Sequence, residues 1–265
     1  MVGETLAPPE RTDPPIRIYL AGGIALRGLN GVTVADRELG SRQARLLLVR
    51  LAAIHEAVPH VELADDLWGP EWPAAWDVAL RALISKLRHA FARVGAPGSL
   101  VSTSGAYALH LPAGAWLDLD AARDAIHRAE IARIAGDLSE ACGWALAARA
   151  ITSRPLLPGE ESEWLERLRR QMADSRLRAL ECLAEVWIAH GDAALGARDA
   201  AEAIELDPYR ESAHRLLIRA HLASGDRGAA TRALEACLRL FEEDLHITPS
   251  AATVSLMEDI QGAGG

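Results

Sequence analysis

Apolar residues recur at helical spacing in three segments of the first half of the chain, and this pattern predicts three helices. These helices span Arg42–His55, Glu62–Trp68 and Trp76–Val94. Short alternating or continuous apolar runs lie on either side of them and predict strands. The strands are Ile16–Leu20, Ile24–Arg27 and Val32–Val34 before the helices, and Leu100–Thr103 with Tyr107–Leu111 after them. Strands, three helices and a terminal hairpin predict a winged helix-turn-helix.

From Asp118 onward the apolar period is helical throughout. The predicted helices are residues 118–135, 138–151, 162–189, 193–206, 210–223, 227–243 and 250–260. A Gly-Asp pair separates the helices of three hairpins, at Gly136-Asp137, Gly191-Asp192 and Gly225-Asp226. The glycine ends one helix, and the aspartate can cap the next. The proline- and acid-rich segment Arg154–Glu163 is predicted to be a loop.

Two of these hairpins form a repeat of 34 residues, Ser175–Pro208 followed by Tyr209–Glu242. The period and the helix-turn-helix layout match the tetratricopeptide repeat, which stacks into a curved scaffold. Small or apolar residues stand where paired helices must touch, at Ala184, Gly196, Ala203, Ile218, Ala230 and Cys237. The predicted fold is therefore mainly α with a small β part, a winged helix followed by a tetratricopeptide-like domain.

The composition of the chain predicts a cytoplasmic protein. Half of its 265 residues are hydrophobic and a quarter are charged, but the longest apolar runs are far too short to span a membrane. Residues 1–15 are rich in proline and acid and are predicted to form a flexible arm, not a signal peptide. Cys142, Cys182 and Cys237 are widely spaced on predicted helices, so we expect reduced, buried thiols.

The net charge of −9 is unevenly distributed. Residues 16–117 carry ten Lys/Arg against eight Asp/Glu, whereas residues 118–265 carry a net charge of −9. A polyanion is repelled by the acidic half, so any nucleic-acid contact is expected in the first half.

No pattern predicts catalysis, a cofactor or a metal site. The histidine pairs His55/His60 and His214/His221 lack a third ligand nearby in the sequence. Gly22-Gly23 is not followed by the helix and lysine of a phosphate-binding loop. We therefore expect a protein that is not an enzyme.

The order of these parts resembles the Streptomyces antibiotic regulatory protein family over residues 16 to about 261. Six strings carry the resemblance. They are Leu39-Gly40-Ser41-Arg42-Gln43-Ala44, Leu63-Ala64-Asp65-Asp66-Leu67-Trp68-Gly69, Leu80-Arg81-Ala82-Leu83-Ile84-Ser85-Lys86-Leu87-Arg88, Glu163-Trp164-Leu165, Leu206-Asp207-Pro208-Tyr209-Arg210-Glu211 and His246-Ile247-Thr248-Pro249-Ser250. Each string is weak alone, but their order and spacing together are specific.

The resemblance implies an OmpR-like winged-helix DNA-binding domain at residues 16–112 and a bacterial transcriptional activator domain at residues 118–261. It implies a sequence-specific regulator that binds double-stranded DNA as a dimer on direct repeats and contacts RNA polymerase. It also implies which residues contact DNA. These are Arg42 at the start of the first helix, Arg81, Ser85, Lys86, Arg88 and His89 on the recognition helix, and Thr103 and Tyr107 in the wing.

A second interpretation remains open, a helical-repeat interaction module whose winged helix no longer reads specific DNA. The wing segment 102–107 lacks the basic residue that the family often has there. Leu83 replaces a polar residue of the recognition helix, and Val78 replaces an asparagine near its start. These departures favour the interaction module, whereas the layout of the whole chain favours the DNA-binding regulator.

Overall fold

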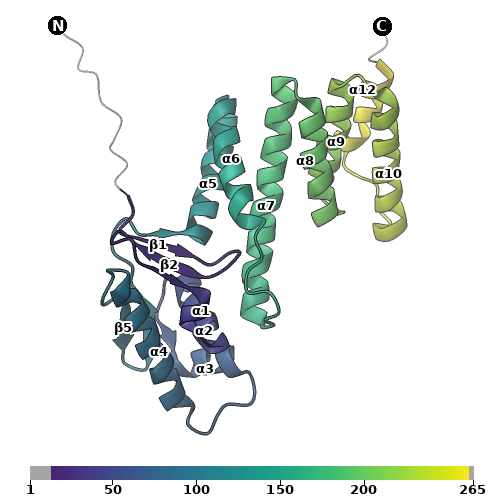
Figure 1. The fold of residues 1–265 in the computed structure, drawn as a ribbon. Helices are drawn as coiled ribbons and strands as arrows, with labels where there is room; N and C mark the ends of the chain where they lie inside the picture. Colours follow the sequence, from purple (N-terminus) through teal and green to yellow (C-terminus); the bar gives the residue numbers. More distant parts are fainter. Residues whose placement is uncertain (1–12, 263–265) are drawn as a thin grey trace, which may run out of the picture. The chain divides into compact units, whose positions relative to one another are not determined.

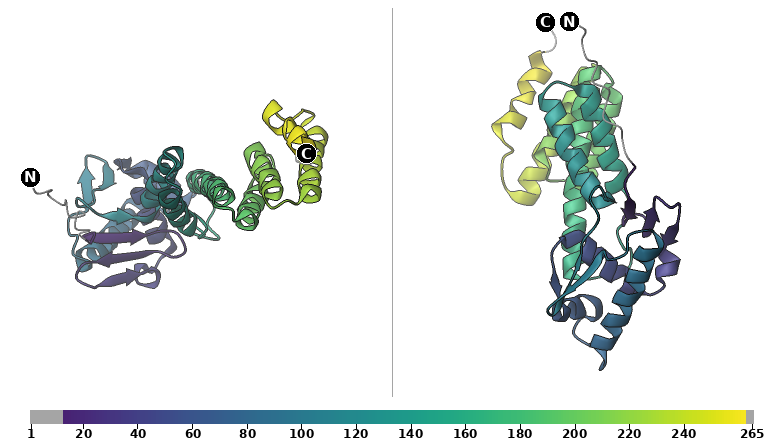
Figure 2. Two further views of the ribbon diagram at one scale, coloured as in Figure 1. Left: turned by 90° about the horizontal axis from the view of Figure 1, so that it is seen from above. Right: turned by 90° about the vertical axis from the view of Figure 1, so that its left-hand side faces the viewer.

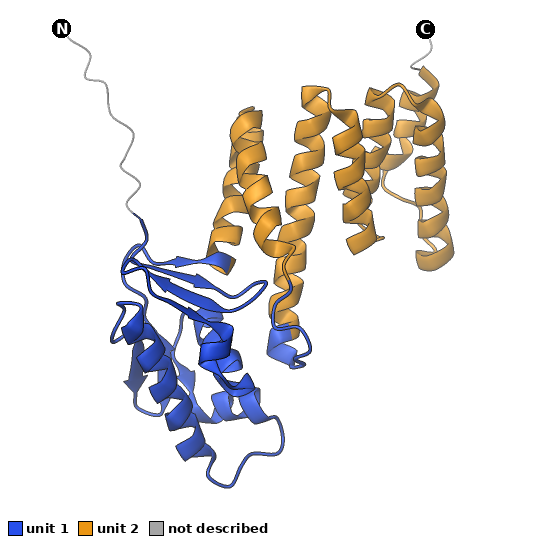
Figure 3. Ribbon diagram, viewed as in Figure 1, with its two compact units in different colours: residues 1–118, 155–165 blue, residues 119–154, 166–265 orange. Residues whose placement is uncertain are grey.

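The computed structural model describes residues 13–262, so most of the predicted arm, residues 1–12, lies outside the described residues. The described chain forms two compact units (Figure 3). Unit 1 holds residues 13–118 and 155–165, and unit 2 holds residues 119–154 and 166–262. None of the helices within residues 13–262 combines the length and the apolar character of a membrane span.

Unit 1 contains two small sheets. The first has the strand order β3-β2-β1-β7 and joins β1 (Ile16–Tyr19), β2 (Ala25–Gly28), β3 (Thr33–Ala35) and β7 (Trp116–Leu117). The second has the order β4-β6-β5 and joins β4 (Val58–Pro59), β5 (Leu100–Thr103) and β6 (Ala106–Leu109). The alternation of apolar residues in β1 buries Ile16 and Ile18 completely, as a strand with one covered face requires. Figure 1 shows β1 and β2 side by side.

Four helices complete the winged helix-turn-helix, which confirms the fold predicted for this half. They are α1 (Asp36–Leu39), α2 (Arg42–Ile54), α3 (His60–Trp68) and α4 (Trp76–Arg93). Ser41 caps α2, because its hydroxyl accepts a hydrogen bond from the backbone N–H of Ala44 at 3.2 Å. The sequence did not predict α1, β4 or β7, which have only two to four residues each.

A segment far away in the sequence also belongs to unit 1. Residues 155–165, here called the clasp, lie beside the turn between β1 and β2, where Ala21 forms a β-bridge with Leu156 and the N–H of Gly22 donates to the carbonyl of Pro155 at 2.8 Å. Trp164 is 8% exposed, and the guanidinium of the buried Arg50 lies 5.6 Å from the centre of its ring. The sequence predicted a loop at Arg154–Glu163 and a helix from residue 162, but it did not predict that this segment packs into unit 1.

Unit 2 is a row of antiparallel helices that follow one another in chain order, as its two views in Figure 2 show. The long helices are α5 (Asp118–Ile134), α6 (Leu138–Thr152), α7 (Glu163–His190), α8 (Ala193–Leu206), α9 (Glu211–Ala223) and α10 (Arg227–Leu245). The predicted last helix is divided into α11 (Ala251–Val254) and α12 (Leu256–Gly262). This arrangement confirms the tetratricopeptide-like repeat.

Successive apolar clusters hold the helices of unit 2 together. One cluster joins α5, α6 and α7, the next two join α7, α8 and α9, and the last joins α9, α10 and α12. The residues predicted to lie at helix contacts are all buried, including Ala203 and Cys237 at 0% exposure. Gly196 lets α8 approach α7 closely, because a Cβ there would lie 2.9 Å from Cγ1 of Ile188. Each helix is therefore stabilised mainly by its neighbours in the row.

The Gly-Asp turns behave as predicted, with one exception. Gly136, Gly191 and Gly225 adopt φ of 80°, 87° and 78°, a conformation that favours glycine. The carboxylates of Asp137 and Asp226 accept hydrogen bonds from backbone N–H groups of the helices that follow, at 2.9 and 2.8 Å. Asp192 occupies the N-cap position of α8, but its side chain makes no capping hydrogen bond.

The buried cysteines lead to a prediction about thiol reactivity. Burial raises the pKa of Cys182 and that of Cys237 to about 11 each, so both remain protonated at neutral pH. We expect the native protein at pH 8 to leave both thiols unmodified by iodoacetamide while the urea-unfolded chain reacts at all three cysteines, as measured by mass spectrometry. Rapid labelling of Cys237 in the native protein would contradict the packing of α10.

Candidate DNA-binding surface

One side of α4 is apolar and buried, and this fixes which side faces solvent. Leu80, Ile84 and Leu87 are at most 1% exposed and pack into unit 1. The predicted DNA-contacting residues of α4 all lie on the exposed side, and they are Arg81, Ser85, Lys86, Arg88 and His89. We call these five residues the α4 face. It stands next to the hairpin β5–β6, as a recognition helix stands next to a wing.

Arg81 is the basic side chain of the α4 face nearest the start of the helix. Its guanidinium is 2.7 Å from the carboxylate of Asp77, one turn earlier, with side chains 64% and 51% exposed. An exposed pair with this spacing contributes only about 0.3–0.5 kcal/mol to stability. Arg81 can therefore exchange Asp77 for a phosphate or a base at little cost.

Arg88 connects the helix to the wing. Its Nε donates a hydrogen bond to the backbone carbonyl of Leu100 in β5 at 3.1 Å. Its two Nη nitrogens make no hydrogen bond to any residue within 13–262. The Leu100 contact orients the guanidinium and leaves its outer edge available, which is the edge that binds phosphate or guanine in a bidentate manner.

Lys86 lies on the opposite flank of the α4 face, toward α1. A Cβ added to Gly40 would stand 2.5 Å from its Nζ, so this ammonium group lies directly over the end of α1. Nearby, Arg93 forms an ion pair of 2.8 Å with Glu38. The pKa of Glu38 is lowered, first by the hydrogen bond from the backbone N–H of Ala35 and then by Arg93. Within the described chain Lys86 itself has no ion pair, so its charge is available.

The two predicted wing residues, Thr103 and Tyr107, differ in their exposure to solvent. Thr103 is exposed at the end of β5, beside the turn Ser104-Gly105. Tyr107 is only 5% exposed, and its ring stacks on that of His60 with 4.4 Å between the ring centres. Tyr107, Ala108 and Leu109 of β6 are all buried, and the ring of Tyr107 faces His60 at the start of α3. As it lies here, Tyr107 supports the wing from inside and presents little surface to DNA.

Arg42 begins α2 and is 47% exposed. Its Nε donates a hydrogen bond to the carboxylate of Glu160 in the clasp. This partner could not be predicted from the sequence, because it lies 118 residues away. Because the Glu160 carboxylate already occupies Nε of Arg42, this arginine must leave it or share it to contact DNA.

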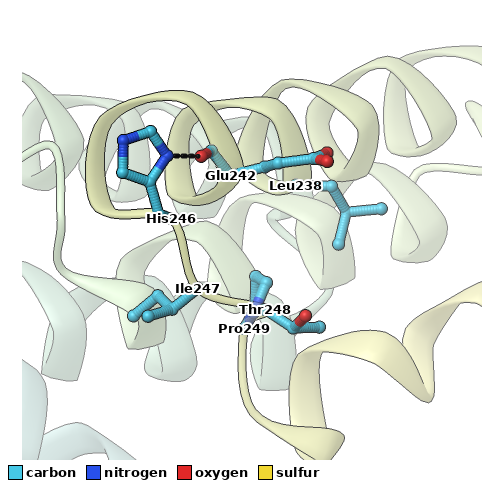
Figure 4. A pocket seen from close by; sticks show the side chains of 6 residues that line it. All are labelled: Leu238, Glu242, His246, Ile247, Thr248 and Pro249. Carbon is cyan, nitrogen blue, oxygen red and sulfur yellow. Dashed lines mark hydrogen bonds between the residues drawn. The ribbon is translucent and has the colours of Figure 1, made fainter.

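The motif His246–Ser250 proves to be a helix stop. His246 adopts a left-handed φ of 54° after α10, and its Nδ1 lies 3.1 Å from the carbonyl of Glu242. Figure 4 shows these two residues beside a hollow of about 500 Å³ that Ile247 and Pro249 also line. The carboxylate of Glu211 in α9 accepts hydrogen bonds from Ser250. The motif thus fastens the last helices to α9.

One histidine of the pairs singled out in the sequence is held inside unit 2. His214 is 6% exposed, and its Nε2 lies 2.8 Å from the carbonyl of Pro208. Within residues 13–262 no group of three His, Cys, Asp or Glu side chains is placed to hold a metal ion.

Known proteins resemble this chain in sequence and in fold. The profile of the bacterial transcriptional activator domain matches residues 117–261. The regulatory protein AfsR of Streptomyces coelicolor is 32% identical over 232 residues, covering 87% of this chain and 23% of AfsR. AfsR of Streptomyces griseus is 28% identical over 222 residues, covering 83% of this chain and 22% of that protein. The chain thus spans about a quarter of the length of these relatives.

A solved structure extends the comparison to both units. Mycobacterium tuberculosis EmbR in complex with a low affinity phosphopeptide matches with a TM-score of 0.83, covering 94% of this chain and 66% of that chain. The sequences are 22% identical, so this likeness concerns the fold. With the profile match and the AfsR relatives, it confirms the resemblance predicted from the sequence: the chain belongs to the Streptomyces antibiotic regulatory protein family, whose members carry the bacterial transcriptional activator domain.

Proposed function

We propose that the protein is a cytoplasmic, sequence-specific DNA-binding regulator that activates transcription. The observation that carries the proposal is the α4 face, a set of polar and basic side chains held outward by a buried apolar stripe beside a wing hairpin. A helix of this kind fits the major groove, where side chains read base edges. The acidic unit 2 is left to contact proteins, and RNA polymerase is the partner that the family suggests.

Each exposed residue has a role in this proposal. Arg81 and Arg88 contact guanine edges or phosphates, and Ser85 and His89 donate to bases between them. Lys86, Arg42 and Thr103 contact the phosphate backbone, which supplies affinity and not sequence preference. Tyr107 positions the wing through its contact with His60.

Two subunits are needed for useful affinity. The proposed DNA-contacting residues include only four Lys or Arg side chains, Arg42, Arg81, Lys86 and Arg88, and Arg42 already pairs with the Glu160 carboxylate. Few phosphates can therefore be neutralised by one subunit, and nonspecific binding should be weak. Two subunits on adjacent direct repeats would add their contacts and bind as a homodimer on DNA.

A second candidate is the interaction module. It is favoured by the wing, because residues 102–107 carry no charged side chain. In that case the winged helix would contribute contacts without specific readout, and unit 2 would bind a partner protein.

The test begins with selection of duplexes from a randomised pool by the full chain. We expect a recurring sequence to emerge and Arg81→Ala to weaken binding to it by about 1–3 kcal/mol, with relaxed preference at one base pair. The measurement is a titration followed by fluorescence anisotropy. Arg27→Ala is the matched control, because it removes the same charge from β2 in the first sheet.

Two outcomes would favour the interaction module. One is a selection that yields no recurring sequence. The other is an equal loss of affinity for Arg81→Ala and Arg27→Ala, because a loss that does not depend on position reflects net charge alone.

A further inference from the structure

Unit 2 contains a basic cavity outside the surface described above. It has a volume of about 580 Å³ and is lined by residues of α5 and α7. Four arginines line it, Arg123 from α5 and Arg167, Arg170 and Arg178 from α7, together with Asp174 and Ser175. These side chains give the lining a surplus of three positive charges within a half of the chain whose net charge is −9. We call this cavity the arginine pocket.

Two of the arginines show how the pocket is built. Nε and Nη2 of Arg178 donate to the two carboxylate oxygens of Glu130 at 2.8 and 2.6 Å. This bidentate contact raises the pKa of Arg178 and fixes its guanidinium at the wall. Arg170 is exposed and makes no hydrogen bond or ion pair with the part of the chain that the structure describes. One cation is thus held in position, and another has no counter-charge.

Ser175 is the second, independent observation. It is only 7% exposed, yet it lines the pocket. A buried helical serine usually satisfies its hydroxyl on the carbonyl one turn earlier. Here the hydroxyl makes no hydrogen bond with any residue in 13–262. Since Ser175 lines the pocket, its hydroxyl is available to donate a hydrogen bond to a ligand oxygen there.

We propose that the arginine pocket binds a small phosphorylated molecule. Guanidinium groups bind phosphate oxygens in pairs, and a serine hydroxyl donates a further hydrogen bond. The volume lies within the range of small-molecule sites. A small ligand fits better than DNA, because Ser175 lies inside the cavity and the rest of this half is acidic. The bound phosphate would bridge α5 and α7 and stabilise unit 2, whether or not unit 1 binds DNA.

The experiment uses pyrophosphate as the probe and the full chain as the receptor. We expect calorimetric titration at constant ionic strength to give saturable binding, and the melting temperature to rise with the pyrophosphate concentration. Arg170→Gln and Ser175→Ala should each weaken binding by about tenfold, because each removes a hydrogen bond to a charged group. Arg219→Gln is the matched control, since Arg219 is an exposed arginine of α9 outside the pocket. Inorganic phosphate is titrated in parallel to show whether one phosphoryl group suffices.

Three results would overturn the proposal. The first is no binding of pyrophosphate at concentrations of about 1 mM. The second is an equal loss for Arg219→Gln, which would mean attraction by net charge. The third is a defect of Arg170→Gln in binding duplex DNA with pyrophosphate affinity unchanged, which would make the arginines a DNA contact. Circular dichroism of each variant checks that folding is intact, and the melting shift of Ser175→Ala provides a second reading if Arg170→Gln unfolds.

Discussion

Replacing Ala203 by arginine is expected to destabilise unit 2 by about 3 kcal/mol or more, through overpacking and a buried charge. Ala203 is 0% exposed in a cluster with Leu177, Leu180 and Ala213, so the helices α7, α8 and α9 meet at its methyl group. An arginine side chain there would force α8 away from both neighbours. Urea unfolding of the full chain, followed by circular dichroism, measures the loss.

Ala194→Arg is the matched control for this change, because Ala194 lies on the same helix and is exposed. It should alter stability by at most about 0.5 kcal/mol. If the two variants unfolded at the same urea concentration, the repeat register proposed for Ser175–Pro208 and Tyr209–Glu242 would be wrong.

Arg50→Ala is expected to have a similarly large effect in unit 1. Arg50 is 5% exposed and forms ion pairs with Glu62 and Asp66 of α3. Its guanidinium also lies over Trp164 of the clasp. Removing one partner of a buried ion pair costs about 3–5 kcal/mol, because the other charge stays buried without compensation. Because Glu62 is 50% exposed, the expected loss is at the lower end of this range, about 3 kcal/mol.

The stability that Arg50→Ala removes should depend on pH, and the loss should shrink as the pH falls. Burial already raises the pKa of Asp66 above its usual 3.8 even with Arg50 present. Without Arg50 the pKa rises further, so the folded state binds a proton more tightly than the unfolded state does. The deficit of Arg50→Ala is therefore largest at neutral pH and shrinks as the pH is lowered toward the usual range of aspartate. Thermal melts between pH 7 and pH 4.5 measure this, and a deficit that grew on acidification would contradict the role given to Asp66.

The helices of unit 2 could be predicted because each buries a periodic apolar stripe against helices close to it in the sequence. The same holds for α2 and α4. By contrast, α1, β4 and β7 are too short to show a period. The clasp could not be predicted, because Leu156 pairs with Ala21 after β1 and Trp164 lies against Arg50 of α2, each more than 100 residues away. Contacts over such distances leave no local pattern.

Only part of the candidate site could be predicted, because some of its contacts come from elements that are distant in the sequence. The helical period places Arg81, Ser85 and Arg88 on one side of α4, and the structure has them there. A sequence does not reveal which way a short strand faces, so the burial of Tyr107 appeared only in the structure. The partners of Arg42 and Arg88, Glu160 and the carbonyl of Leu100, also come from other elements of unit 1. Glu163-Trp164-Leu165 is one of the strings that carry the family resemblance. Its residues Trp164 and Leu165 are buried in unit 1, which the sequence did not predict.

The proposed arrangement places two subunits on adjacent DNA sites, each bound through α4. It is tested most directly by gel shift on duplexes that carry two copies of the selected sequence as direct repeats, at two salt concentrations. With centres about one helical turn apart, the two subunits lie on the same side of the duplex, and we expect cooperative binding. Inserting about half a turn, roughly 5 base pairs, should abolish the cooperativity. Equal, weak and salt-sensitive binding to every spacing and every sequence would contradict the claim and favour the interaction module.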